Sequence, residues 1–280
     1  MSVRRLAGVL EVPVSTVGRW ARVPVQRAPW PRRLPEETDL REKIKALCLE
    51  SRHRTFGHRH IKALLRRVHG LVVNRKRVLR IMRHMGLTQP RIRHKEARPK
   101  RVEKMRPTEP NRAWQIDMTS LRLSDTTPLF LIVIIDCYTR QIVGWNLDRR
   151  CRASEWSAAV RMALEARGLV TKKACEQLTL RSDNGCQPCS KKFRAYLSEA
   201  GVRPQYTGYD APDDNAYVER VIRTIKEEEI WCNLYEKSSE ASTALEDYIN
   251  YYNHQRIHSA LGYQTPDEVN ATAILTLAAA

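Results

Sequence analysis

Hydrophobic positions follow two patterns along the 280-residue chain, and the pattern changes near residue 111. Beyond that point, strands are predicted near residues 113–123, 129–137, 141–148, 177–182 and 202–206. Helices are predicted near 153–167 and 190–200, and from residues 214 and 239. We therefore expect one α/β domain at 111–272 and a tail at 273–280. Trp231 is expected in the core of this domain, with stacking on a base as the alternative.

Before residue 111 the periodic segments are all helical. Residues 1–22 predict a partial helix-turn-helix, although an amphipathic helix pair that packs on a neighbour explains them equally well. Residues 23–37 contain four prolines and predict a linker. Residues 38–89 predict a module of three helices, the second of which begins after Gly57.

The third helix of this module carries a row of positive charges. Asn74 is its candidate N-cap, and Val78, Ile81 and Met82 form its apolar face. The outward positions are Arg75, Lys76, Arg77 and Arg80. A small helical module with a basic last helix suits DNA binding, in which that helix lies in a groove or along the backbone. These four basic residues are therefore predicted to contact DNA.

The positive charge of the chain is concentrated in its N-terminal part. Residues 1–110 hold 29 Lys and Arg against 9 Asp and Glu, a net charge of +20, whereas residues 111–280 have a net charge of −2. Residues 90–110 predict a basic linker that cannot bury a core of its own. A basic part joined to a near-neutral α/β domain is what processing of DNA or RNA requires. The alternative is a basic region that serves only solubility or adhesion to a membrane surface.

Features of the sequence also bear on its compartment. Nothing predicts a signal peptide, and the longest wholly apolar run, residues 129–135, is too short to span a bilayer. Seven cysteines without a secretion signal predict reduced thiols and a cytoplasmic protein. Cys186 and Cys189 form a C-x-x-C, but no second Cys or His pair stands near it, so we do not predict a zinc site.

Three carboxylates are the candidate chemical groups of the α/β domain. Asp117 lies in the first predicted strand, Asp183 ends the fourth, and Glu219 lies on the helix that begins at 214. On that helix Asn215, Glu219 and Lys226 fall along one face. Each carboxylate alone reads as an ordinary surface residue, but the three together predict an all-oxygen site that suits Mg²⁺ or Mn²⁺. Two such ions about 3.5–4 Å apart activate an attacking oxygen and stabilise the leaving oxygen of a phosphodiester.

Two stretches carry a family resemblance: Ser182-Asp183-Asn184-Gly185 and Asp214-Asn215-Ala216-Tyr217-Val218-Glu219-Arg220. Together with Asp117 they resemble the Asp-Asp-Glu triad of retroviral-integrase-type transposases, with 35 residues between the last two acids and Lys226 seven residues later. The chain looks like the catalytic OrfB-type product of bacterial insertion sequences that fuse two reading frames. Supporting segments agree in order at 131–136, 140–145 and 252–263, and the resemblance covers roughly residues 52–270.

The resemblance implies a ribonuclease-H-like catalytic core, a five-stranded mixed sheet with helices, preceded by small all-α helix-turn-helix-like modules. It implies a DDE transposase in which Asp117, Asp183 and Glu219 bind two Mg²⁺ or Mn²⁺ ions. Metal-activated water would cut one strand at each element end, and the freed 3′-OH would then attack another phosphodiester. Further DNA contacts would come from Lys226, Asn215, Arg223, Arg256 and His258. A structural role is an equal alternative for the last two, and orienting Glu219 is the alternative for Asn215.

The implied partners are double-stranded DNA, comprising the terminal repeats and the target, and further copies of the chain on that DNA. A protein from the upstream frame is another expected partner, and the expected location is the bacterial cytoplasm at the nucleoid. The chain departs from the family at Arg181, where relatives have His, and at Pro188, where they have an aromatic residue. Because the triad is intact we expect an active enzyme. The alternatives are a non-catalytic DNA-binding regulator of the element and a plain metal-dependent nuclease.

Overall fold

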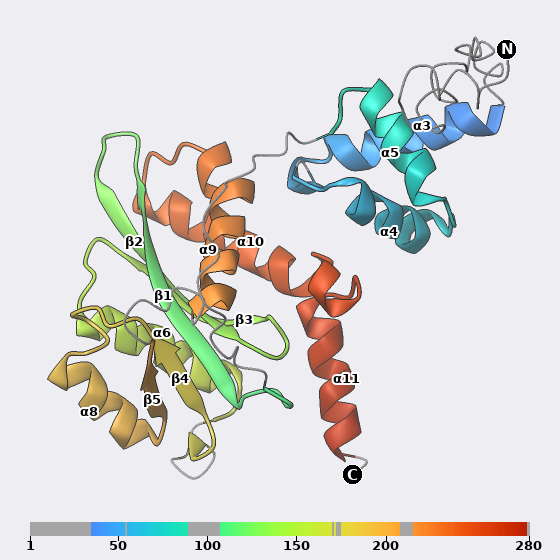
Figure 1. Cartoon of the computed structure of the whole chain (residues 1–280). Helices are drawn as coiled ribbons and strands as arrows, with labels where there is room; N and C mark the ends of the chain where they lie inside the picture. Colours follow the sequence, from blue (N-terminus) through green and yellow to red (C-terminus); the bar gives the residue numbers. More distant parts are fainter. Residues whose placement is uncertain are drawn as a thin grey trace, which may run out of the picture.

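The computed structural model describes residues 35–53, 55–88, 107–169, 171, 175–207 and 215–278. The predicted partial helix-turn-helix at 1–22 lies outside these residues, as do most of the two predicted linkers. Figure 1 shows a small group of helices beside a larger domain built on a sheet. Within the described part of the chain, no helix combines the length and the apolar character needed to cross a membrane.

Three helices form the small N-terminal group, which we call the helical module: α3 Pro35–Leu49, α4 His58–His69 and α5 Arg75–His84, with a 3-10 turn η1 at Ser51–His53. As predicted, α4 follows Gly57, and the Asn74 side chain caps α5 by accepting the Lys76 N–H at 2.8 Å. The linker predicted to reach residue 37 was wrong at its end, because α3 already begins at Pro35. Proline is well tolerated in the first turn of a helix.

A five-stranded mixed sheet is the centre of the larger domain: β1 Ala113–Arg122, β2 Pro128–Asp136, β3 Ile142–Asp148, β4 Thr179–Ser182 and β5 Arg203–Tyr206. Their order in space is β3-β2-β1-β4-β5. β1 pairs antiparallel with β2 and parallel with β4, so it is the central strand. Each strand coincides with a predicted one to within two residues.

Helices cover both faces of the sheet: α6 Ala153–Ala166 and α8 Lys191–Ala200 on one, α9 Ala216–Glu228 and α10 Ser238–His254 on the other. Alternate residues of β2 serve the two cores, since Leu131 and Val133 pack with α9 and α10, and Ile132 packs with α6 and α8. A Cβ at Gly144 would lie 2.5 Å from the backbone oxygen of Ala159. Glycine there lets α6 lie close against β3.

The C-terminal part differs from its prediction. After the 3-10 turns η3 Ile230–Cys232 and η4 Ser259–Leu261, the chain forms α11 Pro266–Ala278, so the predicted tail at 273–280 is helical to residue 278. α11 begins with a capping box, in which Glu268 N–H donates to Thr265 Oγ1 at 3.2 Å and Thr265 N–H donates to Glu268 Oε2 at 2.9 Å. Trp231 was predicted in the core, but it lies in η3 and is 67% exposed.

The helical module is packed onto the segment that follows α10. Ile257 from that segment is buried in the same apolar cluster as Leu65 of α4 and Ile81 of α5. Polar contacts add to this interface, because Arg67 of α4 pairs with Glu268 of α11. The larger domain and the module thus share one apolar cluster, and α9 and α10 lie between the sheet and the module (Figure 1).

Candidate active site

Asp117 and Asp183 lie on neighbouring parallel strands. Gln115 of β1 pairs with Arg181 of β4, and the same register continued by two residues sets Asp183 beside Asp117. Side chains two residues apart on a strand point to the same face. Asp117 is half-buried and Asp183, directly after β4, is exposed. The sheet therefore brings the two predicted aspartates to one place.

Helix α9 brings Glu219 toward the same strand. The Gln115 side chain is 1% exposed, and its Oε1 accepts the backbone N–H groups of Tyr217 at 3.0 Å and Val218 at 3.1 Å. These N–H groups belong to the first turn of α9, where a helix has no partners of its own for them. Sequence reasoning missed Gln115. Its signal is a polar residue on a buried strand, two positions before Asp117 and on the same face.

Asn215 makes a second tie between α9 and β1. Its Nδ2 donates to the Ile116 carbonyl at 3.3 Å, and the residue is 3% exposed. We predicted a DNA contact for Asn215, but its side chain is turned inward, to the strand that carries Asp117. Its position supports the other predicted role, that of orienting Glu219.

The charges of the predicted residues act on one another. Burial, together with the smaller effects of the negative charges of Asp183 and Glu219, raises the pKa of Asp117 to about 6. The Met118 N–H, which donates to Asp117 Oδ1 at 2.7 Å, and the positive charge of Lys226 oppose this rise. A buried carboxylate beside other negative charges is an environment that a bound cation would stabilise.

The turn after β4 is shaped around the carboxylate of Asp183. Gly185 N–H donates to Asp183 Oδ1 at 3.2 Å, and a Cβ at Gly185 would lie 3.1 Å from that oxygen. A larger residue would therefore crowd the carboxylate. Asn184 fixes the next position, because its Nδ2 donates to the Thr207 carbonyl at 2.8 Å.

The two departures from the family pattern are both accommodated in the fold. Arg181 is 8% exposed within β4 and is part of the sheet interior. Pro188 stands where relatives have an aromatic residue, and the Tyr206 hydroxyl donates to its carbonyl at 3.3 Å. A tyrosine from β5 thus packs the loop that lacks its own aromatic residue.

The donor set of this site consists of oxygen atoms only, which fits Mg²⁺ or Mn²⁺. Among the residues that the structure describes, no three His, Cys, Asp or Glu side chains converge closely enough to hold one ion. Binding by all three acids therefore requires their side chains to move closer together. Asp183 and Glu219 are exposed, which gives their side chains room to turn toward Asp117.

Arg256 and His258, which we predicted to contact DNA, are instead part of the protein interior. Arg256 is 8% exposed, and its guanidinium donates to both carboxylate oxygens of Glu228, at 2.8 Å and 2.7 Å. Burial and the positive charge of Arg256 lower the pKa of His258 to about 3. The burial of Arg256 and its two hydrogen bonds to Glu228 favour the structural alternative for this residue.

The other predicted DNA contacts lie on two surfaces. Lys226 is partly exposed on α9, where Arg223 is exposed and pairs with Glu227 at 2.7 Å. On α5, the exposed residues are Arg75 and Lys76. Arg77 and Arg80 are half-buried, and Arg80 reaches Glu37 of α3 at 3.4 Å. These contacts stay predictions.

Similarity to known proteins agrees with this geometry. Residues 107–211 and 200–266 match two family models described as Integrase core domain, and residues 35–96 match an HTH-like domain. The chain is 32% identical over 246 residues to the transposase for insertion sequence element IS904 of Lactococcus lactis subsp. lactis (strain IL1403), which covers 83% of this chain and 94% of that protein. It is 28% identical over 243 residues to the putative transposase InsK for insertion sequence element IS150 of Escherichia coli (strain K12), with 82% of each covered.

A solved structure supports the fold. The chain superposes on a chain of the simian T-cell lymphotropic virus intasome in complex with PP2A regulatory subunit B56 gamma with a TM-score of 0.51 and 17% identity, covering 81% of this chain and 74% of that one. The mixed sheet with its flanking helices is thus the predicted ribonuclease-H-like core. The integrase core, the helix-turn-helix-like module and the identity to the lactococcal protein show that this chain belongs to the insertion-sequence transposases of the DDE, retroviral-integrase superfamily.

Proposed function

We propose that Asp117, Asp183 and Glu219 are the catalytic residues with which this transposase cuts and joins DNA strands at the ends of its insertion sequence, and that they hold two Mg²⁺ or Mn²⁺ ions. The observation that carries this proposal is the register of β1 and β4, which sets Asp183 beside Asp117, where burial and the charges of Asp183 and Glu219 raise the pKa of Asp117. Gln115 ties α9 to β1 at the same place, so the start of the helix that carries Glu219 is held beside the strand that carries Asp117.

Metal ions bound at this site would supply an activated oxygen nucleophile and a counter-charge for the leaving oxygen. The carboxylates hold and space the ions, and the ties from Gln115 and Asn215 limit how far Glu219 can move from Asp117. Lys226, on the same helix, contacts a phosphate next to the cut. Cleavage frees a 3′-OH at each element end, and that hydroxyl attacks a second phosphodiester without a covalent protein intermediate.

The remaining parts of the chain serve the same reaction. Residues 38–89 would bind terminal-repeat DNA, and the region 111–272 would carry catalysis on those repeats and on target DNA. Joining two ends to one target requires at least two copies of the chain on the DNA. A protein from the upstream frame would supply the main DNA-reading domain. The complex would work at the bacterial nucleoid.

A strand-transfer assay tests this proposal. Labelled duplexes that carry the element ends are incubated with the full chain and Mg²⁺ or Mn²⁺, with EDTA in the control. Joined products that require the metal ion support the proposal. Cleavage without joining would indicate a plain nuclease, and binding without cleavage a regulator, so either result would contradict it.

A further inference from the structure

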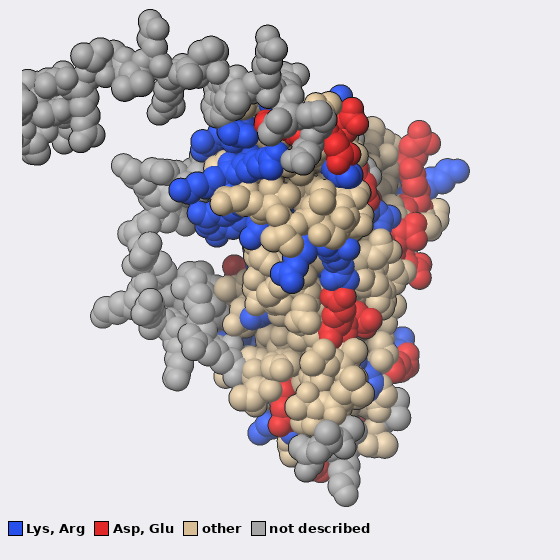
Figure 2. Space-filling model, turned by 90° about the vertical axis from the view of Figure 1, so that its right-hand side faces the viewer, with Lys and Arg blue, Asp and Glu red and all other residues tan. Residues whose placement is uncertain are grey.

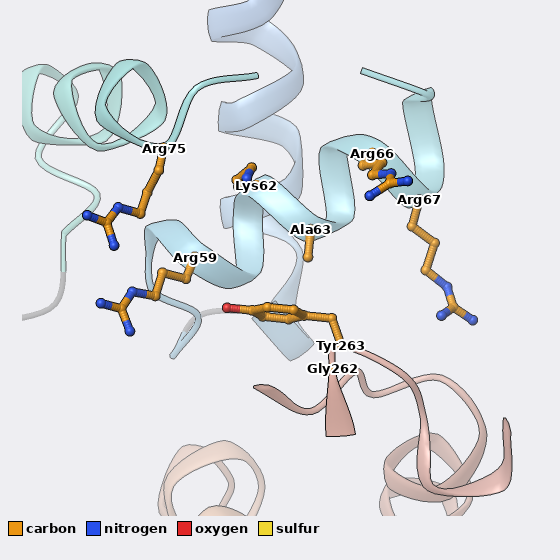
Figure 3. A pocket seen from close by; sticks show the side chains of 8 residues that line it. All are labelled: Arg59, Lys62, Ala63, Arg66, Arg67, Arg75, Gly262 and Tyr263. Carbon is orange, nitrogen blue, oxygen red and sulfur yellow. The ribbon is translucent and has the colours of Figure 1, made fainter. Parts of the chain in front are cut away.

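A basic groove lies where the helical module meets the segment after α10. It has a volume of about 570 Å³ and is lined by two sides, α4 with the start of α5 and the turn at Gly262 and Tyr263. Figure 3 shows the Tyr263 ring lying along α4, with the guanidinium groups of Arg59 and Arg75 extending to the same side. We call the hollow the α4 groove. Its two sides come from parts of the chain almost 200 residues apart.

Four of the five positive charges that line the α4 groove are unpaired within the part of the chain that the structure describes. Arg59, Lys62, Arg66 and Arg75 are all exposed, and none has an ion-pair partner within the described residues. Arg67, in contrast, is held by Glu268. Figure 2 shows Lys and Arg gathered over the upper part of the face that bears the module. Four uncompensated cations around one hollow point to a polyanionic ligand.

The spacing of these cations fits a chain of phosphates. Arg59, Lys62 and Arg66 are three and seven residues apart on α4, so they share one face of the helix over about 10 Å. Consecutive phosphates of one DNA strand advance about 3.4 Å along the helix axis. The row therefore spans about three phosphate-to-phosphate steps of one strand, with Arg75 beside its first member.

Tyr263 closes the α4 groove in an unusual backbone conformation. Gly262 and Tyr263 both have left-handed backbones, with φ of 66° and 68°, and the Tyr263 N–H donates to the His258 carbonyl at 2.8 Å. A non-glycine residue pays a strain energy for this conformation, which is retained only when its surroundings impose it. The ring meets the edge of His60, with 5.4 Å between centroids, and stays partly exposed to the groove.

We propose that the α4 groove binds the sugar-phosphate backbone of duplex DNA, with phosphates on Arg59, Lys62, Arg66 and Arg75 and a sugar or base edge against the ring of Tyr263. This surface shares Arg75 with the outward row predicted on α5, but its other cations lie on α4. It joins the module to the core, because the same DNA segment touches α4 and the turn after α10. Contacts to the backbone position DNA without reading its sequence, so the groove contributes equally to binding of any duplex. The proposal rests on the DNA-transposase function of the chain.

Salt dependence of DNA binding by the full chain tests the proposal. The variant R59A/K62A/R66A removes two Arg and one Lys from the groove. The control R149A/R150A/K237A also removes two exposed Arg and one exposed Lys, from the loop after β3 and the start of α10, although Arg150 lies 3.9 Å from Asp148. Binding is measured in EDTA from 50 to 200 mM salt, on an element-end duplex and on a scrambled duplex. A thermal melt of each variant verifies that it is folded.

Each phosphate contact contributes about 0.9 to the slope of log K against log salt. We expect the groove variant to reduce the magnitude of that negative slope by about 2 to 3 on both duplexes. The control should change it by less than about 1. Tyr263→Leu should weaken binding about five-fold or more without a change of slope, whereas Tyr263→Phe should keep it. An unchanged slope in the groove variant, or equal losses in both triple variants, would overturn the proposal. Strand joining by the groove variant is also measured at saturating protein. Joined products there would show that the variant is weakened in DNA binding and not in the chemistry proposed for the triad.

Discussion

Helix α9 carries an acidic residue of interest at each end, and the pKa values at the two ends are shifted in opposite directions. Glu219, in the first turn, belongs to a cluster in which burial and neighbouring negative charges raise the pKa of Asp117 to about 6. Glu228, in the last turn, has a side chain only 3% exposed, and burial alone would raise its pKa as well. Hydrogen bonds and the charge of Arg256 outweigh that burial, and the pKa of Glu228 is lowered.

The partners of Glu228 come from three parts of the molecule. Besides Arg256, the Thr55 hydroxyl donates to Glu228 Oε1 at 2.7 Å and the Tyr248 hydroxyl donates to Oε2 at 2.8 Å. Thr55 belongs to the helical module, so this carboxylate also ties the module to the core. The comparison teaches that burial does not decide the role of an acid. Hydrogen bonds and an ion pair satisfy Glu228 within the protein, whereas burial and the charges of Asp183 and Glu219 leave the pKa of Asp117 raised.

The largest expected effect is on catalysis. Asp183→Asn keeps the shape of the side chain but removes one negative charge from the acidic cluster, so metal-dependent strand cleavage should fall at least about 10²-fold. Binding to element ends should persist, and the free energy of unfolding should not fall, because a repulsion has been removed. Strand-cleavage and gel-shift assays measure both. Asp247→Asn, at an exposed position of α10, is the control and should cleave normally. Loss of end binding in a folded Asp183→Asn protein would contradict the assignment.

The opposite pattern is expected at the other end of α9. Glu228→Gln leaves the buried Arg256 without its counter-charge, and breaking a buried pair in this way costs about 3–5 kcal/mol of unfolding free energy. The neighbouring Glu227→Gln breaks only an exposed pair with Arg223 and should cost less than about 1 kcal/mol. Urea titrations of the two variants give both values. Equal losses would mean that the Glu228 pair is not a structural support.

A third effect, of about 2–3 kcal/mol, should come from metal ions. A ligand present at a hundred times its dissociation constant stabilises the fold by about 2.7 kcal/mol. Mg²⁺ or Mn²⁺ should therefore raise the melting temperature of the wild-type chain but not that of Asp183→Asn. Because ligands must lose their protons to bind metal, the gain should fade as the pH falls below about 6, the pKa of Asp117. A gain in the melting temperature of Asp183→Asn as large as that of wild type would place the ion elsewhere.

The contrast between the two sites also separates what the sequence could and could not predict. Asp117 and Asp183 were found because each stands within or directly after a strand with a clear apolar pattern, and Glu219 because helical spacing relates it to Asn215 and Lys226. Each of these signals can be recognised within a short stretch of sequence. The fold then places β1 beside β4 and packs α9 against β1.

The Glu228 pair has no comparable signal. Thr55, Glu228 and Arg256 are separated by 173 and 28 residues, and each lies in a polar stretch that resembles a solvated surface. That is why Arg256 was predicted at the DNA. Gln115 was missed for a similar reason, since its partners are backbone N–H groups about a hundred residues away. Helix α11, in contrast, had a readable start in its Thr265-Pro266-Asp267-Glu268 capping box.

The smallest predicted effect is a difference in pH dependence. The pKa of Asp117 is raised from 3.8 to about 6, so the folded chain takes up this proton before the unfolded chain does, and this group adds stability as the pH falls from 6 toward 4. Near Glu228, burial and the charge of Arg256 lower the pKa of His60 from 6.5 to about 4, and that of His258 is lowered as well. These groups contribute stability above pH 6.5, which is lost as the pH falls.

As the pH falls, the wild-type chain gains stability through Asp117 and loses stability through His60 and His258. Asp117→Asn removes only the gain. At pH 7 this variant should be more stable than wild type by on the order of 1 kcal/mol, because a buried, repelled charge is gone. Near pH 4 the wild-type carboxyl is itself mostly protonated, so the advantage should disappear, and the stability of the variant should fall more steeply between these two values. Urea titrations at pH 7, 5.5 and 4 measure this difference. A constant difference across that range would mean that the charge on Asp117 does not repel its neighbours in the folded chain, which would remove the physical basis for distinguishing the two ends of α9.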